Sequence, residues 1–235
     1  MTSIDLPYII CSILCFIPAM VLHEMAHGFA AYKLGDPTAK QQGRLSFNPA
    51  KHIDPFGTVI LPLFLMVMNM PIFGYAKPVP YNPRYFKDPR KGDLIVGLAG
   101  PLANLIQALV GALIMTGISF GFNALYDANK ELALTIINTD AFNYIFYTFF
   151  PMYILINLYF MFFNLIPIPP LDGSSIFAFI LPVKYLPTYY KIQQYALPIF
   201  MVVCILVPQI FNVNPISVYL NVTAVNLFYF LVSFV

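Results

Sequence analysis

The chain has 235 residues, of which 60% are hydrophobic and only 9% are charged, and its formal net charge is +2. Soluble domains carry about 25% charged residues, so the composition excludes an ordinary soluble protein and predicts an all-α multi-pass membrane protein. The length predicts a single membrane-embedded domain over residues 1–235, and because no basic block is present, no nucleic-acid partner is expected.

Six apolar segments are candidates for crossing the membrane, because a spanning helix needs about 20 mostly apolar residues. They are residues 6–33, 56–73, 94–120, 141–166, 193–211 and 215–235. Proline-rich stretches at 76–90 and 166–173 follow two of these segments, and both are expected to be extended because proline interrupts a helix.

The distribution of basic residues predicts which segments cross. Nine of the twelve Lys and Arg residues lie in the stretches 33–54 and 74–93. Because Lys and Arg near segment ends favour the cytoplasmic side, both stretches should be cytoplasmic and residues 56–73 should not cross between them. That segment contains Pro62 and Pro71 and is predicted to be re-entrant. The result is five crossings with the N-terminus outside; in the rival topology, residues 56–73 cross.

The first apolar segment contains the sequence HEMAH at positions 23–27. On a helix, His23 and His27 project from one face about 5–6 Å apart at Cβ, which suits two ligands of one metal ion. Glu24 points to the side and can reach a metal-bound water, as in the H-E-x-x-H pattern of zinc proteases. Since ionisable groups inside a membrane are costly, a functional role is favoured over a purely structural polar cluster.

Asp172 is the candidate for a third ligand, because a hydrolytic zinc site usually has three protein ligands and one water. In the five-crossing topology, segment 141–166 runs from outside to inside and brings Asp172 to the cytoplasmic half. Counting back from Lys33 at 1.5 Å per residue places His23 and His27 about 9–15 Å below the cytoplasmic surface, at a compatible depth. The alternative is that Asp172 caps a helix.

Five stretches together resemble the site-2 protease family of intramembrane zinc metalloproteases, in its short prokaryotic form without a PDZ domain. They are HEMAHGFAAYKLGD (23–36), GRLSFNPAKHIDPFGT (43–58), AKPVPYNPRYFKDPR (76–90), GPLANL (100–105) and NLIPIPPLDG (164–173). They span about 150 residues and occur in the family's order.

The resemblance implies one zinc ion per chain, held by His23, His27 and Asp172, with Glu24 as the catalytic base. It implies a core of three helices with a membrane-embedded segment after the first. The implied activity is hydrolysis of peptide bonds within or near transmembrane segments, in a prokaryotic plasma (inner) membrane. The implied substrate is a transmembrane protein or a signal peptide in the lipid bilayer. The chain departs from the family at 170–173, where PLDG replaces the Asn-Pro-Asp-Gly of many members, so any substrate contact of that asparagine does not carry over.

Three further polar residues have open roles. Asn104 either contacts the substrate or an oxyanion, or forms a hydrogen bond between helices. Asn164 has the same alternatives. His52 lies in a stretch expected to be cytoplasmic, and a structural or surface role is predicted rather than a fourth metal ligand.

The alternative function is a catalytically inactive membrane scaffold or a zinc transporter, because intramembrane histidines and acids also line ion pathways. Glu24 distinguishes a protease from a transporter, because a hydrolase needs a carboxylate beside its metal ligands and a transporter does not. If the activity is proteolytic, residues 56–73 could bind an unwound substrate as an edge strand. The oligomeric state is left open.

Overall fold

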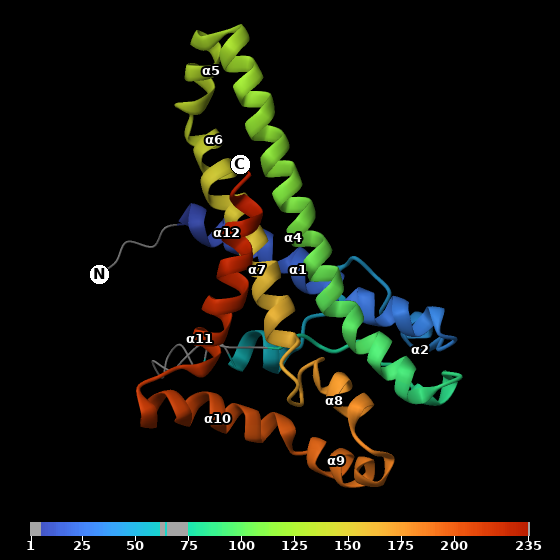
Figure 1. Cartoon of the computed structure of the whole chain (residues 1–235). Coiled ribbons are helices and arrows are strands. Elements are labelled where there is room, and N and C mark those ends of the chain that lie inside the picture. Colours follow the sequence, from blue (N-terminus) through green and yellow to red (C-terminus); the bar gives the residue numbers. More distant parts are fainter. Residues whose placement is uncertain (1–5, 62–63, 65–74, 235) are drawn as a thin grey trace. The chain divides into compact units, whose positions relative to one another are not determined.

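The computed structural model describes residues 6–61, 64 and 75–234, and within them every regular element is a helix (Figure 1). This confirms the all-α prediction. The α-helices are α1 (Leu6–Lys33), α2 (Thr38–Gln41), α4 (Pro89–Ala128), α5 (Lys130–Ile137), α6 (Asp140–Asn143), α7 (Phe150–Asn164), α8 (Ser174–Ile180), α9 (Leu186–Gln193), α10 (Ala196–Phe211), α11 (Pro215–Leu220) and α12 (Asn226–Val232). Short 3-10 or π turns are η1 (Pro49–Lys51), η2 (Pro55–Ile60), η3 (Pro83–Tyr85), η4 (Tyr144–Phe149), η5 (Val183–Tyr185) and η6 (Asn221–Val225).

Four helical stretches of the described residues are long and apolar enough to cross a membrane. They are Leu6–Lys33, Pro89–Ala128, Asp140–Asn164 and Pro215–Val232. A fifth is obtained if Val183–Gln193 and Ala196–Phe211, which meet at a bend of 71°, form one broken span. The number agrees with the predicted five crossings, although the helix predicted at 94–120 is longer at both ends.

The segment predicted to be re-entrant, 56–73, lies mostly outside the described residues. Its first residues belong to η2, which Asp54 caps by accepting hydrogen bonds from the N–H groups of Phe56 and Gly57. Re-entry and the edge strand therefore stay predictions. The proline-rich stretch 76–90 is free of helix up to residue 82, as predicted, but Pro83–Tyr85 form η3 and α4 begins at Pro89, so the prediction is wrong for the end of the stretch.

The described chain forms two compact units. Of the described residues, unit 1 contains 6–19, 104–162 and 220–234, and unit 2 contains 20–61, 64, 75–103 and 163–219. The single-domain organisation over 1–235 stays a prediction. In unit 1, Ile154 and Leu158 of α7 are fully buried.

Unit 2 begins with the second half of α1, whose end has a specific cause. Gly35 adopts φ +103°, and the N–H groups of Gly35 and Asp36 donate to the carbonyls of Tyr32 and Ala31. This is the Schellman arrangement, in which a left-handed glycine satisfies the last carbonyls of a helix. It turns the chain sharply and delivers the Asp36 side chain into the interior, where it is fully buried.

Candidate metal centre

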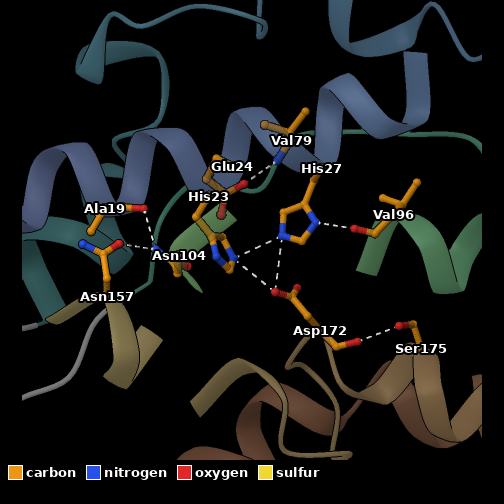
Figure 2. Close-up of polar contacts among 10 residues, drawn as sticks. All are labelled: Ala19, His23, Glu24, His27, Val79, Val96, Asn104, Asn157, Asp172 and Ser175. Atoms are coloured by element: carbon orange, nitrogen blue, oxygen red, sulfur yellow. Dashed lines mark hydrogen bonds and ion pairs between the residues drawn. The ribbon is translucent and has the colours of Figure 1, made fainter. Parts of the chain in front are cut away.

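Three side chains of unit 2 meet at one point (Figure 2). His23 and His27 project from α1, and Asp172 comes from the turn between α7 and α8. The Nε2 atoms of the histidines lie 3.1 Å apart, and Asp172 Oδ2 lies 3.1 Å from His23 Nε2 and 3.3 Å from His27 Nε2. Both histidines are buried. The structure therefore brings together the three residues that the sequence singled out as possible ligands.

The triangle of ligand atoms has the dimensions of one face of a zinc tetrahedron. Zinc lies about 2.0–2.1 Å from histidine nitrogen or carboxylate oxygen, so neighbouring ligands of a tetrahedral ion are about 3.3–3.4 Å apart. The three distances here are within 0.3 Å of that spacing. Three ligands on one face leave the fourth corner for a water or a substrate oxygen, as catalytic zinc sites do.

The surroundings of His27 fix which of its nitrogens faces the centre. Its Nδ1 lies 2.7 Å from the carbonyl oxygen of Val96 on α4, which can only accept a hydrogen bond. Nδ1 therefore carries a proton, and in the neutral form that binds a metal ion the ring would turn an unprotonated Nε2 towards the Asp172 carboxylate. Two lone-pair atoms at this distance repel each other unless a proton or a metal ion lies between them. The donor set thus fits a metal ion.

Gly100 of α4 provides the space for the imidazoles. A Cβ atom at this position would overlap the rings of both His23 and His27. The glycine at this position therefore makes room for the two candidate ligands.

The turn that carries Asp172 is fixed by short hydrogen bonds. The Gly173 N–H donates to the carbonyl of Asn164 at 2.6 Å, and a Cβ at Gly173 would collide with the backbone of Leu165. The Ser175 hydroxyl donates to the Asp172 carbonyl at 2.7 Å. Helix α8 begins after Gly173 without a side-chain cap, so the alternative in which Asp172 serves as a helix cap is wrong.

The electrostatic environment keeps the Asp172 carboxyl ionised. Burial raises the pKa of this carboxyl, but the neighbouring charges and hydrogen bonds of His27 and His23 outweigh burial, so its pKa lies below the ordinary value. An ionised carboxylate is the form that binds a metal ion.

Glu24 lies beside the three candidate ligands and lines a cavity of about 350 Å³ together with His27 and Asp172. Its Oε2 accepts a hydrogen bond from the N–H of Val79 at 3.0 Å (Figure 2). The carboxylate therefore has access to the same open space as the candidate ligands, as a general base at this centre requires.

The cavity wall also contains polar residues that the sequence analysis missed. Tyr81 donates from its hydroxyl to Asp93 at 2.6 Å, and Tyr190 and Gln193 line the same cavity. Burial and the nearby Asp93 carboxylate raise the pKa of Tyr81, so its hydroxyl stays protonated and continues to donate. Asp93 directly precedes the predicted span 94–120, and it joins the helix only because α4 begins earlier than predicted, at Pro89.

Asn104 is fully buried in unit 1, and its Nδ2 donates to the Ala19 carbonyl at 3.1 Å and to Asn157 Oδ1 at 2.8 Å. These bonds join α1, α4 and α7, which is the interhelical alternative. An oxyanion or substrate role for Asn104 stays a prediction.

Asn164 and His52 have backbone and packing roles in the structure. The Asn164 carbonyl accepts from Gly173, while a substrate contact of its side chain stays a prediction. His52 is fully buried with Nε2 2.8 Å from the Ser46 carbonyl, so its predicted structural role is confirmed and a surface position is wrong.

Comparisons with known proteins agree with one another. The family model described as "Peptidase family M50" matches residues 11–207. A relative from Bacillus subtilis (strain 168), named "Putative zinc metalloprotease YwhC", is 36% identical over 198 residues, which cover 84% of this chain and 80% of the relative.

Two more distant relatives are named "Putative zinc metalloprotease Rip2". The one from Mycolicibacterium smegmatis is 32% identical over 92 residues, or 39% of this chain and 34% of the relative. The one from Mycobacterium tuberculosis (H37Rv) is 25% identical over 157 residues, or 67% of this chain and 52% of the relative. No solved structure matches the chain.

Proposed function

Since the chain belongs to peptidase family M50, we propose that it is a zinc metalloprotease that cleaves membrane proteins within or near their transmembrane segments. The observation that carries this proposal is the triangle formed by His23 Nε2, His27 Nε2 and Asp172 Oδ2 beside the Glu24 carboxylate. Two histidines four residues apart on a helix, with a carboxylate between them, form the donor set and base of a zinc hydrolase.

In the proposed reaction, His23, His27 and Asp172 hold one zinc ion. When bound, zinc supplies Lewis-acid chemistry: it polarises the scissile carbonyl and lowers the pKa of a water molecule towards neutrality. Glu24 takes a proton from that water and later delivers it to the leaving amine. Val96 supports this chemistry by holding His27 in the tautomer that leaves Nε2 free for the ion.

Two observations support action inside the membrane. First, the two histidines lie within α1, a helix long and apolar enough to cross a bilayer. Second, the 1.5 Å rise per residue places them about 9–15 Å from the level of Lys33 at the helix end. A substrate at that depth is itself a membrane segment, either a transmembrane protein or a signal peptide.

The proposed orientation places the N-terminus outside and the centre near the cytoplasmic side of a prokaryotic plasma membrane. The basic stretches after α1 and before α4 support this orientation, because Lys and Arg favour the cytoplasmic face. Water then has a short path to the cavity that contains Glu24.

The experiment that tests the proposal is substrate trapping with the Glu24→Gln variant in a host strain that lacks the wild-type protein. The variant is expected to retain zinc and to be recovered cross-linked to membrane proteins or signal peptides, which the wild-type protein then cleaves in proteoliposomes. A zinc transporter or an inactive scaffold would give no cleavage by the wild type, and that result would overturn the proposal.

A further inference from the structure

An extended segment of unit 2 contacts the Glu24 carboxylate. We call residues 75–82 the strap. In the middle of the strap, the Val79 N–H donates to Glu24 Oε2 at 3.0 Å (Figure 2). Among the described residues, none donates a hydrogen bond to the second oxygen, Oε1. One carboxylate oxygen is therefore held by the backbone, and the other remains available for a proton.

Two buried charged side chains fasten the strap on either side of Val79. Arg44, which is 6% exposed, donates from Nη2 to the carbonyls of Lys77 and Pro78 at 2.5 and 3.2 Å. Asp36, which is fully buried, accepts from the Asn82 N–H at 2.6 Å. Burying a charge is costly unless it forms strong hydrogen bonds. Both charges form such bonds with this one segment of backbone.

The strap also packs directly on α1, one helical turn beyond Glu24. A Cβ at Gly28 would lie 2.8 Å from Val79 Cγ1 and 2.7 Å from Leu45 Cδ2, which is too close for either contact. Gly28 is thus the residue that allows Val79 to approach the helix face carrying Glu24. Earlier in the strap, the Lys77 N–H donates to the carbonyl of the fully buried His52 at 2.8 Å.

We propose that the strap is a positioning element for the catalytic base: the Val79 N–H holds Glu24 Oε2, and Arg44 and Asp36 act on Glu24 through the strap. This inference rests on the proposed protease function. A glutamate side chain has several rotatable bonds, so a fixed donor to one oxygen keeps the other directed at the reacting water. The opposite reading, that the strap occupies Glu24 and restrains it, predicts the opposite sign in the same experiment.

The most specific change removes only the backbone N–H donor of Val79. Replacing the Pro78–Val79 amide by an ester, with the α-hydroxy analogue of valine at position 79, deletes the N–H and keeps the side chain. The matched control is the same ester at Ala76, whose N–H donates to none of the described residues. With a trapped substrate, the ester at position 79 is expected to lower kcat about 10- to 100-fold with unchanged KM and zinc content. The Ala76 ester should leave kcat near the wild-type value.

An infrared measurement tests the contact independently of activity. The chain has two glutamates, Glu24 and Glu131, so 13C-labelled glutamate in a Glu131→Gln background reports Glu24 alone. The ester at position 79 should shift the carboxylate stretching band, and the Ala76 ester should not. An unshifted band overturns the inference, whatever the protein's activity proves to be.

The side chains that fasten the strap give the last part of the test. Arg44→Met is expected to lower kcat about 10-fold or more while zinc content stays at the wild-type level, and Arg44→Lys should restore part of the loss, because lysine still donates to a carbonyl. A parallel fall in zinc content and kcat would show that Arg44 has a merely structural role. A rise in kcat would show that the strap restrains Glu24. Either result would overturn the proposal that the strap positions Glu24. If the wild type cleaves while the ester at position 79 is equally active, only this inference fails.

Discussion

Nε2 of His23 lies 3.1 Å from Nε2 of His27, on adjacent turns of a helix apolar enough to cross a membrane. Asp172 Oδ2 completes a triangle with both nitrogens. Two imidazoles and a carboxylate at these distances in a buried site can hold one metal ion, and the first two predictions rest on that arrangement.

Gly100→Ala is expected to weaken zinc binding about 10- to 100-fold, because the added methyl group would overlap both imidazole rings and displace them. Zinc affinity of the purified variant, measured by competition with a chelating dye, checks this. Gly117→Ala is the matched control, since it lies in the same helix with no atom within 4 Å of its Cβ. Equal zinc affinity of the two variants would contradict the role given to Gly100.

Zinc affinity should fall as the pH is lowered, because protons compete with the metal ion for the imidazole nitrogens of His23 and His27. The Asp172 carboxyl does not limit binding, because its pKa lies below its ordinary value and it stays ionised. Chelator competition from about pH 8 to about pH 5 checks this. Asp172→Asn should bind more weakly but keep the same pH slope; a pH-independent affinity of the wild type would argue against two histidine ligands.

Asn104→Ala and Asn157→Ala should each destabilise the protein by about 1–2 kcal/mol, because each leaves a buried amide without its partner. Their effects should be non-additive in the double variant, since both remove one hydrogen bond. Thermal unfolding in detergent measures this. If Asn104 instead acts on the substrate, Asn104→Ala would lower kcat at wild-type KM while Asn157→Ala would not.

The proposed topology predicts opposite labelling of two exposed lysine positions. In a background without Cys11, Cys15 and Cys204, a cysteine at Lys87 should be protected from an impermeant thiol reagent added outside intact cells, and a cysteine at Lys130 should react. Both should react in opened membranes. External modification at position 87 would support the rival topology, in which residues 56–73 cross.

The sequence predicted the helical class and the three residues of the centre because both depend on local patterns. Apolar runs of about 20 residues indicate spanning helices, and a spacing of four places two histidines on one face. Asp172 could be found because loop charges indicate which ends of the segments share a side of the membrane.

The contacts that organise the centre could not be predicted from the sequence. They are made by backbone atoms, or they depend on the room left where a glycine has no side chain. The Val96 carbonyl that orients His27 and the Val79 N–H that binds Glu24 have no signature in residue identity. Arg44 appeared as one more cytoplasmic charge, although it is buried against the strap. Charge patterns report the side of the membrane but not burial within a folded loop.

The most direct test of the central claim compares wild type and Glu24→Gln on one trapped substrate in proteoliposomes, with zinc measured in the same samples. Both proteins should contain one zinc ion per chain. The wild type should release fragments whose new ends, located by mass spectrometry, fall within or near a transmembrane segment, and Glu24→Gln should cleave at least 100-fold more slowly. Equal cleavage by the zinc-loaded Glu24→Gln protein, or cleavage by the wild type after complete zinc removal, would contradict the account.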